Sequence, residues 1–301
     1  MSTTTQASPR LATTPQAPMW ALARVEAGRM LRSPAPWIGI ALWAASNAFT
    51  LTSAPGWVSS QYMELTTSAT FLALGVSIAV AYAFGRERTN VSEEASMPAD
   101  QRAAGRLLGG LSLVALVAVV VAAGAAWLRL RGGLPLGAEP GRTLHAHFSL
   151  PELLQPVLVA AFAVALGAAV VHLARHPLTA SIVLFVFWFI AGPAYWTING
   201  PVLRWLTPVQ VQPISVEAAP ATTDPLTLPA TWLLEGPGPF QDHWARLLVL
   251  PELAAWHDLY LVALTLLTAA VALPGRYRRP LLVVGTVLAI VAIALQRSVT
   301  P

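Results

Sequence analysis

Seven stretches of this sequence are rich in apolar residues and carry no Asp, Glu, Arg or His near their centres. The longest covers residues 107–128 and reads LLGGLSLVALVAVVVAAGAAWL. About 20 such residues in a helix cross the hydrocarbon core of a bilayer, and a backbone in lipid must satisfy its own hydrogen bonds. We therefore predict an all-α, polytopic membrane helical bundle of six to seven transmembrane helices. The stretches lie near 37–53, 68–85, 107–128, 153–173, 178–198, 255–273 and 280–296.

The composition agrees with a bilayer environment. Apolar residues make up 55% of the 301 residues and charged residues only 11%, whereas soluble domains average about 25% charged residues. So few charges cannot coat a water-soluble surface of this size. The sequence pI of about 10.1 fits positive loops that face an anionic leaflet better than nucleic-acid binding, so we expect no nucleic-acid partner.

Two missing residue types exclude several kinds of chemistry. The chain has no cysteine, which excludes disulfides, thiolate metal sites and cysteine nucleophiles. It has no lysine either, since all 18 basic residues are arginine, and this excludes a P-loop and any Schiff-base cofactor. HExxH and GxSxG are absent as well. We predict no catalytic residues, no cofactor, no metal site and no enzyme activity.

Two pairs of neighbouring residues could suggest a site. His172 and His176 are four apart, as helix-borne metal ligands can be, but no carboxylate or thiolate is near them. His257 and Asp258 are adjacent, and adjacent residues on a helix do not face each other. We interpret both pairs as anchors at the membrane interface.

The N-terminal part divides into a tail and a helix. Residues 1–18 are Thr, Ala, Pro and Gln with little to bury, which predicts a disordered cytoplasmic tail. Residues 19–301 then form one transmembrane domain, which opens with an interfacial helix at 19–32. We expect Trp20 to lie at headgroup depth and the arginines to face phosphates. Ser33-Pro34-Ala35-Pro36 ends this helix before the first span.

The arginine distribution predicts the orientation. With the N-terminus in the cytoplasm, 12 of the 18 arginines fall in inside segments, as the positive-inside rule requires, and seven spans place the C-terminus outside. Residues 199–254 then form a large, Pro-rich extracytoplasmic loop, whose length predicts some structure of its own, such as short helices on the membrane. LPEL occurs at 150–153 and at 250–253, where each copy opens a span. We interpret it as helix-start chemistry, with an internal duplication as the alternative.

The spans carry little that could power transport. Coupled transporters usually have an ionisable group near the middle of the membrane, whereas Asp258 and His172 lie only at span ends. If the protein moves a substrate, we expect another subunit to supply the energy. The spans contain Gly, Ala and scattered hydroxyls, which suit a lipid-like cargo and are equally explained by helix packing.

The predicted cytoplasmic loop at 86–106 contains signals for the start and the end of a short helix. Ser92 is a suitable helix cap, Glu93 and Glu94 suit the first turn, and Pro98 ends the helix. This predicts a short helix on the cytoplasmic face, and an ordinary charged loop is the alternative.

Several motifs follow one another along the chain: Glu26 with Arg29 and Arg32, Pro34, Arg86-Glu87-Arg88, Glu93-Glu94-Ala95-Ser96-Met97-Pro98, Arg102 with Arg106, and Ala255-Trp256-His257-Asp258-Leu259-Tyr260-Leu261. In these motifs the chain resembles the ABC-2-type permeases, the membrane subunits of bacterial ATP-binding-cassette exporters. The chain departs from the family at two points. Asn90-Val91 stands where the family often has Gly-Thr, and the common member has six spans with both ends inside.

The resemblance implies a mechanism and partners. The helix near 91–98 would be a coupling helix that docks into a cytosolic ATPase subunit, and two permeases, identical or homologous, would work with two ATPases in the bacterial cytoplasmic membrane. The implied ATPase contacts are Arg86, Glu87, Arg88, Ser92, Glu93, Glu94, Met97 and Arg102, and the implied interfacial-helix residues are Trp20, Glu26, Arg29 and Arg32. Two other functions remain as alternatives: a membrane scaffold or sensor that uses the same loop, and a lipid-modifying membrane enzyme.

Overall fold

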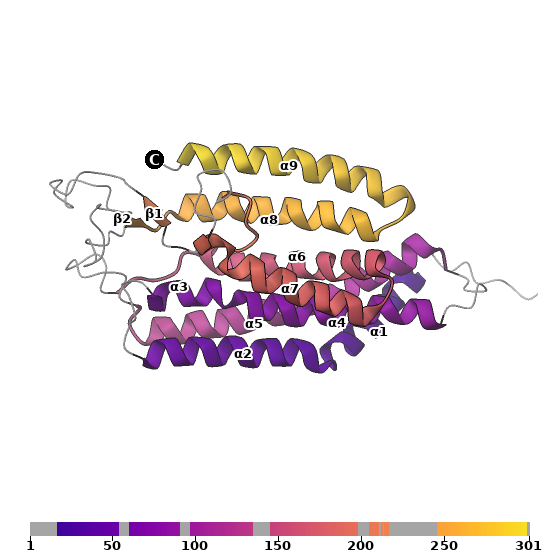
Figure 1. Ribbon diagram of the computed structural model, residues 1–301, viewed down its shortest axis with the longest axis horizontal. Helices are drawn as coiled ribbons and strands as arrows, with labels where there is room; N and C mark the ends of the chain where they lie inside the picture. The colour runs from indigo at the N-terminus through magenta and orange to yellow at the C-terminus, as the bar shows by residue number, and fades with distance from the viewer. Residues whose placement is uncertain are drawn as a thin grey trace, which may run out of the picture.

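A computed structural model describes residues 17–53, 60–90, 97–134, 145–197, 205–210, 212, 214–216 and 246–299 of the chain. These residues form a bundle of long helices (Figure 1). Five helical segments are long and apolar enough to cross a membrane: Ser60–Arg86, Ala99–Leu130, Leu150–Ala174, Pro251–Ala272 and Gly275–Val299. The prediction of a helical, membrane-type fold is confirmed to this extent.

Helices dominate the element order. The helices are α1 (Ala17–Leu31), α2 (Pro34–Thr52), α3 (Ser60–Thr67), α4 (Ala69–Asn90), α5 (Ala99–Leu130), α6 (Leu150–Ala174), α7 (Pro177–Thr197), α8 (Pro251–Ala272) and α9 (Arg278–Val299), with a short 3-10 helix η3 (Gly275–Tyr277) before the last. Each predicted apolar stretch lies on a different helix, α2 or one of α4 to α9.

The large predicted loop contains structure that the all-α prediction missed. Strands β1 (Ile214–Val216) and β2 (Arg246–Leu248) pair antiparallel, with Ser215 opposite Leu247. The start of the loop also returns to the bundle, because Trp205 and Val209 are buried. Polar backbone in a short extended segment needs a partner strand, and the pairing of residues so distant in sequence could not be predicted from local pattern.

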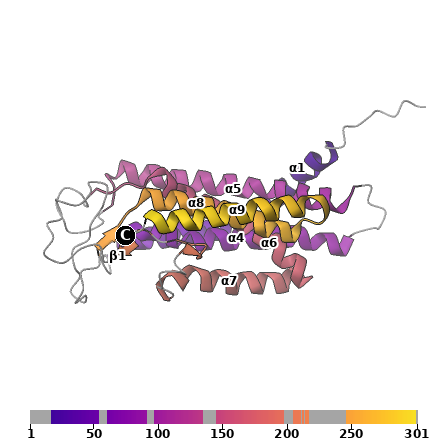
Figure 2. The same cartoon turned by 90° about the horizontal axis from the view of Figure 1, so that it is seen from above.

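Helices α4 and α6 occupy the middle of the bundle. Figure 2 shows α5 on one side of this pair and α7 on the other, while α8 and α9 lie together along a third side (Figure 1). The central helices approach closely, since a Cβ atom added at Gly167 of α6 would lie 2.4 Å from the carbonyl oxygen of Ser77 on α4. The indole Nε1 of Trp188 on α7 donates to the Ser77 hydroxyl at 3.1 Å. Such glycine contacts and interhelical hydrogen bonds are how membrane helices associate.

The chain runs back and forth between two ends of the bundle (Figure 1). One end, which we call the α1 end, holds α1, the end of α4 and the start of α5. Arg276 of η3 forms an ion pair with Asp100 of α5 at 3.5 Å, and a Cβ at Gly85 would lie 2.9 Å from Pro177. The turns before α7 and α9 therefore lie at the α1 end too. The strands and the end of α9 lie at the opposite end, which we call the β end.

Candidate functional site

At the α1 end, the N-terminal helix packs on the base of α5. A Cβ at Gly109 of α5 would lie 2.9 Å from the carbonyl oxygen of Ala23 and 3.1 Å from the backbone nitrogen of Ala27. Glycine is needed here because any side chain would push the two helices apart. Ala23 and Met30 of α1 are buried in the protein, and Trp20 is 51% exposed.

Glu26 is the polar residue on the buried face of α1. It is 3% exposed, and its Oε1 accepts a hydrogen bond from Arg29 at 3.0 Å. A buried carboxylate requires such a partner, since burying an unpaired charge costs several kcal/mol by order of magnitude. Glu26 thus belongs to the contact between α1 and the bundle, while Arg29 and Arg32 are exposed. The placement of α1 at a membrane interface stays a prediction.

The predicted ATPase contacts are only partly within the described residues. Arg86 lies on α4 at the α1 end, where its Nε donates to the carbonyl oxygen of Tyr82 at 3.3 Å. Arg102 lies in the first turns of α5, and its guanidinium donates to the carbonyl oxygen of Met97. Glu87 and Arg88 continue helix α4, and their side chains lie outside the described part of the chain. Ser92, Glu93 and Glu94 lie outside the described residues, as do all of residues 91–96 of the predicted coupling helix.

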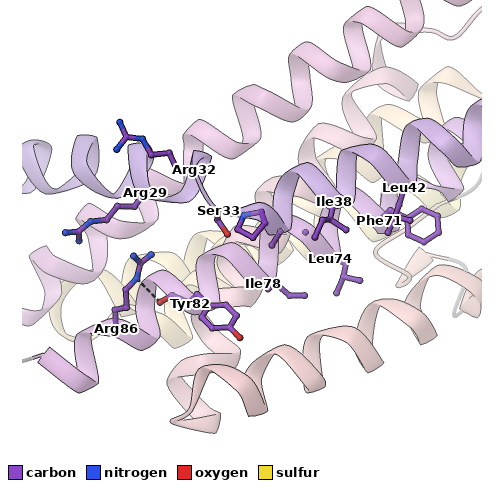
Figure 3. Close-up of a pocket in the computed structure, with 14 residues that line it drawn as sticks. Arg29, Arg32, Ser33, Ile38, Leu42, Phe71, Leu74, Ile78, Tyr82 and Arg86 are labelled. Carbon is purple, nitrogen blue, oxygen red and sulfur yellow. Dashed lines mark hydrogen bonds between the residues drawn. The ribbon is translucent and has the colours of Figure 1, made fainter.

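A groove opens beside these arginines (Figure 3). Its volume is about 660 Å³, and it lies between α2 and α4 where the end of α1 meets them. The lining residues are Arg29, Arg32, Ser33, Pro34, Ala35, Ile38, Gly39, Leu42, Phe71, Leu74, Gly75, Ile78, Tyr82 and Arg86. Figure 3 shows the three arginines gathered at one end and the apolar side chains extending from it. No pattern in the sequence indicated this groove.

Toward the β end, a buried carboxylate joins two helices. Glu152, in the first turn of α6, is buried. Its Oε1 accepts a hydrogen bond from the hydroxyl of Tyr62 on α3 at 2.9 Å, and its Oε2 accepts from the backbone nitrogen and hydroxyl of Ser149 at 2.8 and 2.7 Å. Ser149 and Glu152 form a capping box, so the LPEL segment does supply helix-start chemistry at its first copy.

A second polar cluster connects α6, α8, α9 and the segment at 205–212. His257 Nδ1 lies 2.9 Å from Gln296 Oε1, and Gln155 Nε2 donates to Gln210 Oε1 at 3.2 Å. The Tyr260 hydroxyl donates to a backbone carbonyl oxygen of the same segment at 3.0 Å. We call this set, together with buried Asp258, the buried polar layer.

The buried polar layer corrects the prediction that His257 and Asp258 anchor the chain at the membrane interface. Helix α8 begins at Pro251, so both residues lie nearly two turns inside it, and both are buried. As expected for adjacent residues they do not form a pair, since His257 instead contacts α9. Ionisable groups therefore do occur inside helices that are apolar enough to cross a membrane.

Two signals in the sequence could have indicated this layer. The second LPEL segment marks the start of α8 and so places His257 well inside the helix. Gln296 ends the last apolar stretch, and an amide on a membrane helix usually has a partner on another helix. The pairing itself spans 39 residues and has no local signature.

The other histidine pair has a structural contact. The Nδ1 of His176 accepts a hydrogen bond from the backbone nitrogen of Leu178 at 3.2 Å, in the first turn of α7. Across the described residues, no group of three or more His, Cys, Asp or Glu side chains could hold a metal ion.

Comparison of the chain with models of known protein families and with curated proteins finds no match to either.

Proposed function

We propose that the chain is the membrane-spanning permease subunit of an ABC-2-type exporter, which moves its substrate with energy from a separate cytosolic ATPase. The observation that carries this proposal is the packing of α1 against the first turns of α5, beside the end of α4. Gly105 and Gly109 hold α1 against α5, so the N-terminal helix and both sides of the segment 91–96 lie at one end of the bundle. In the ABC-2-type permeases that the chain resembles, the N-terminal helix and the loop after the second span lie on the cytoplasmic side.

In this proposal α2 and α7 cross the membrane together with the five longer helical segments, which gives seven spans. Both helices turn large apolar side chains outward: Phe49 of α2 is 73% exposed and Phe189 of α7 is 70% exposed. Such side chains are stable in lipid and costly in water. Seven spans with a cytoplasmic N-terminus place the end of α9 on the outside.

The length of α5 explains how force could reach the spans. Its 32 residues extend for about 48 Å, whereas the hydrocarbon core is about 30 Å thick. Because the apolar stretch of α5 begins only at residue 107, in this proposal the first turns of α5 project beyond the core at the α1 end and carry α1 with them. An ATPase subunit that pushes on residues 91–98 would move α5 and α1 together. A second permease would complete the central path for the substrate.

Co-purification tests the proposal. The variant Glu93→Arg/Glu94→Arg should lose the ATPase subunit that accompanies the wild-type chain from its native host. The matched control is Glu217→Arg/Asp224→Arg, which makes the same charge change in the predicted extracytoplasmic loop and should retain the ATPase. A wild-type chain that brings down no ATPase, or a coupling-loop variant that binds it as well as the control does, would contradict the proposal.

The buried polar layer, together with buried Glu152, favours a second candidate, a carrier driven by an ion gradient. Glu152, His257 and Asp258 are buried within membrane-type helices, and buried ionisable groups are typical of coupled transport. Purified chain in proteoliposomes separates the two functions. Uptake driven by a proton or sodium gradient without ATPase supports the carrier, and uptake that requires ATPase and ATP supports the permease.

A further inference from the structure

We propose that a strip of polar side chains beside α2 faces water inside the membrane, as one wall of an aqueous path that favours cations. We call this set the polar strip. It consists of side chains that α3 and the start of α4 expose at intervals of three residues, together with one serine of α2: Gln61, Glu64, Thr67, Thr70 and Ser46. All five are partly exposed. The inference rests on the proposed crossing of the membrane by α2 and does not depend on an ATPase.

The polar strip contains a carboxylate that α2 holds in place. The Ser46 hydroxyl donates to Glu64 Oε1, and the Thr50 side chain hydrogen-bonds the same carboxylate. Both partners are neutral hydroxyls, so they fix the position of the carboxylate without supplying a positive charge to it. The carboxylate remains partly exposed beside them.

The length of α2 places this carboxylate inside the hydrocarbon core. The 19 residues of α2 extend for about 28 Å, and the core is about 30 Å thick, so a crossing α2 lies within the core over its whole length. Ser46 lies six residues before the end of α2 at Thr52, which is about 9 Å along the helix. Its bond to Glu64 carries that carboxylate to nearly the same depth. Asn47 Nδ2 donates to Ser68 Oγ at 2.9 Å, so Thr67 lies at this depth too.

A partly exposed carboxylate at this depth does not face lipid. Ionisable groups within a membrane face either the interior of the bundle or a water-filled cavity. Glu152 and Asp258 meet the first condition, because both are buried, whereas Glu64 is not. Exposed hydroxyls alone would not decide the matter, since a helical threonine can bond its own backbone, as Thr67 does to the carbonyl oxygen of Met63 at 2.9 Å. The carboxylate is therefore the group that requires water beside the polar strip.

The other side of α2 has the opposite character at the same depth. Ala44, Ala45, Ala48 and Phe49 are exposed there, and none of them has a polar side chain. Such a surface is stable in lipid. Ala48 follows Asn47, whose amide contacts Ser68, so Ala48 and Thr67 lie at about one level and differ in the direction that they face. The two positions form a matched pair for an accessibility test.

Thiol labelling tests whether the polar strip faces water, because the chain has no cysteine of its own. Single variants Thr67→Cys, Thr70→Cys and Ala48→Cys of the full chain are treated in open membrane fragments with charged methanethiosulfonates, which react with thiolates and so require water. Thr67→Cys and Thr70→Cys should be labelled and Ala48→Cys should not, while all three should react after denaturation. Unreactive Thr67→Cys and Thr70→Cys would overturn the inference and leave the crossing of α2 intact. Labelling of Ala48→Cys as well would overturn both, since the end of α2 would then lie in water.

The charge of Glu64 provides a second measurement in the Thr67→Cys variant. A trimethylammonium methanethiosulfonate should react about fourfold faster than a sulfonate one, each rate being taken relative to a free thiol. The reason is that a unit charge about 10 Å away in water shifts the two rates about twofold in opposite directions. Adding Glu64→Gln should abolish this preference. Adding Glu252→Gln, which removes an exposed carboxylate in the first turn of α8, should retain it. Equal rates in Thr67→Cys, or a preference that survives Glu64→Gln, would overturn the assignment of a cation-favouring path.

Discussion

His257 on α8 and Gln296 on α9 meet inside the protein, with 2.9 Å between Nδ1 and Oε1 and with neither side chain exposed (0% for both). The contact joins two helices that are each apolar enough to cross a membrane. Gly285 of α9 packs against Ala263 and Leu267 of α8, so the polar contact adds to a close packing of small and aliphatic side chains. We call the pair of His257 and Gln296 the polar lock between the last two helices.

The lock predicts non-additive stability in a double-mutant cycle. His257→Leu and Gln296→Leu should each lower the melting temperature in detergent, because each leaves a buried polar group without this partner. The double variant should be more stable than the sum of the two losses predicts, with a coupling free energy of about 0.6–1.7 kcal/mol. Additive losses would show that the two side chains do not support each other in the folded protein.

The hydrogen bond between Tyr62 and Glu152 predicts that the Tyr62 hydroxyl stabilises the protein at the start of α6. Tyr62→Phe removes only the hydroxyl that donates to Glu152, so it should destabilise the protein by about 1–2 kcal/mol. The change is measured as a lower melting temperature. Tyr82→Phe is the matched control, since Tyr82 is 45% exposed, and its melting temperature should stay near that of the wild type. Equal effects of the two substitutions would contradict a specific role for the Tyr62 hydroxyl.

Alanine substitution should have opposite effects on stability at two glycines, because only one of them lies where α4 and α6 approach closely. Gly167→Ala places a Cβ 2.4 Å from the Ser77 carbonyl oxygen, and the resulting separation of the helices should cost about 1–3 kcal/mol. At Gly28 of α1 a Cβ meets nothing within 4 Å. Gly28→Ala should therefore be neutral or stabilise the protein by up to about 1 kcal/mol through helix propensity. Thermal unfolding of both variants checks the pair, and a tolerated Gly167→Ala would contradict the packing.

The helices could be predicted from the sequence because a long apolar run has few other solutions in lipid. The stretch at 107–128 lies within α5, and the break at Ser33-Pro34 separates α1 from α2 as expected. These features depend on neighbours in the sequence, where periodicity and proline act directly. The helix count across the membrane and the coupling helix stay predictions.

The contacts between helices could not be predicted in the same way. The lock between His257 and Gln296, the bond from Tyr62 to Glu152 and the pairing of β1 with β2 each join residues far apart in the sequence. The groove exists because Gly39 and Gly75 let α2 and α4 touch at their backbones. Many arrangements of apolar helices would satisfy the same hydropathy pattern, and only the packed structure selects one of them.

The permease proposal depends most directly on residues 86–106 lying on the cytosolic face. Because the chain has no cysteine, single cysteines at the exposed positions Ala99, Leu130 and Ser298 can each report one end of the bundle. A membrane-impermeant maleimide added to intact cells should label Leu130→Cys and Ser298→Cys, and should label Ala99→Cys only after lysis. Labelling of Ala99→Cys in intact cells would place the α1 end outside, where no cytosolic ATPase could reach it, and would contradict the proposal.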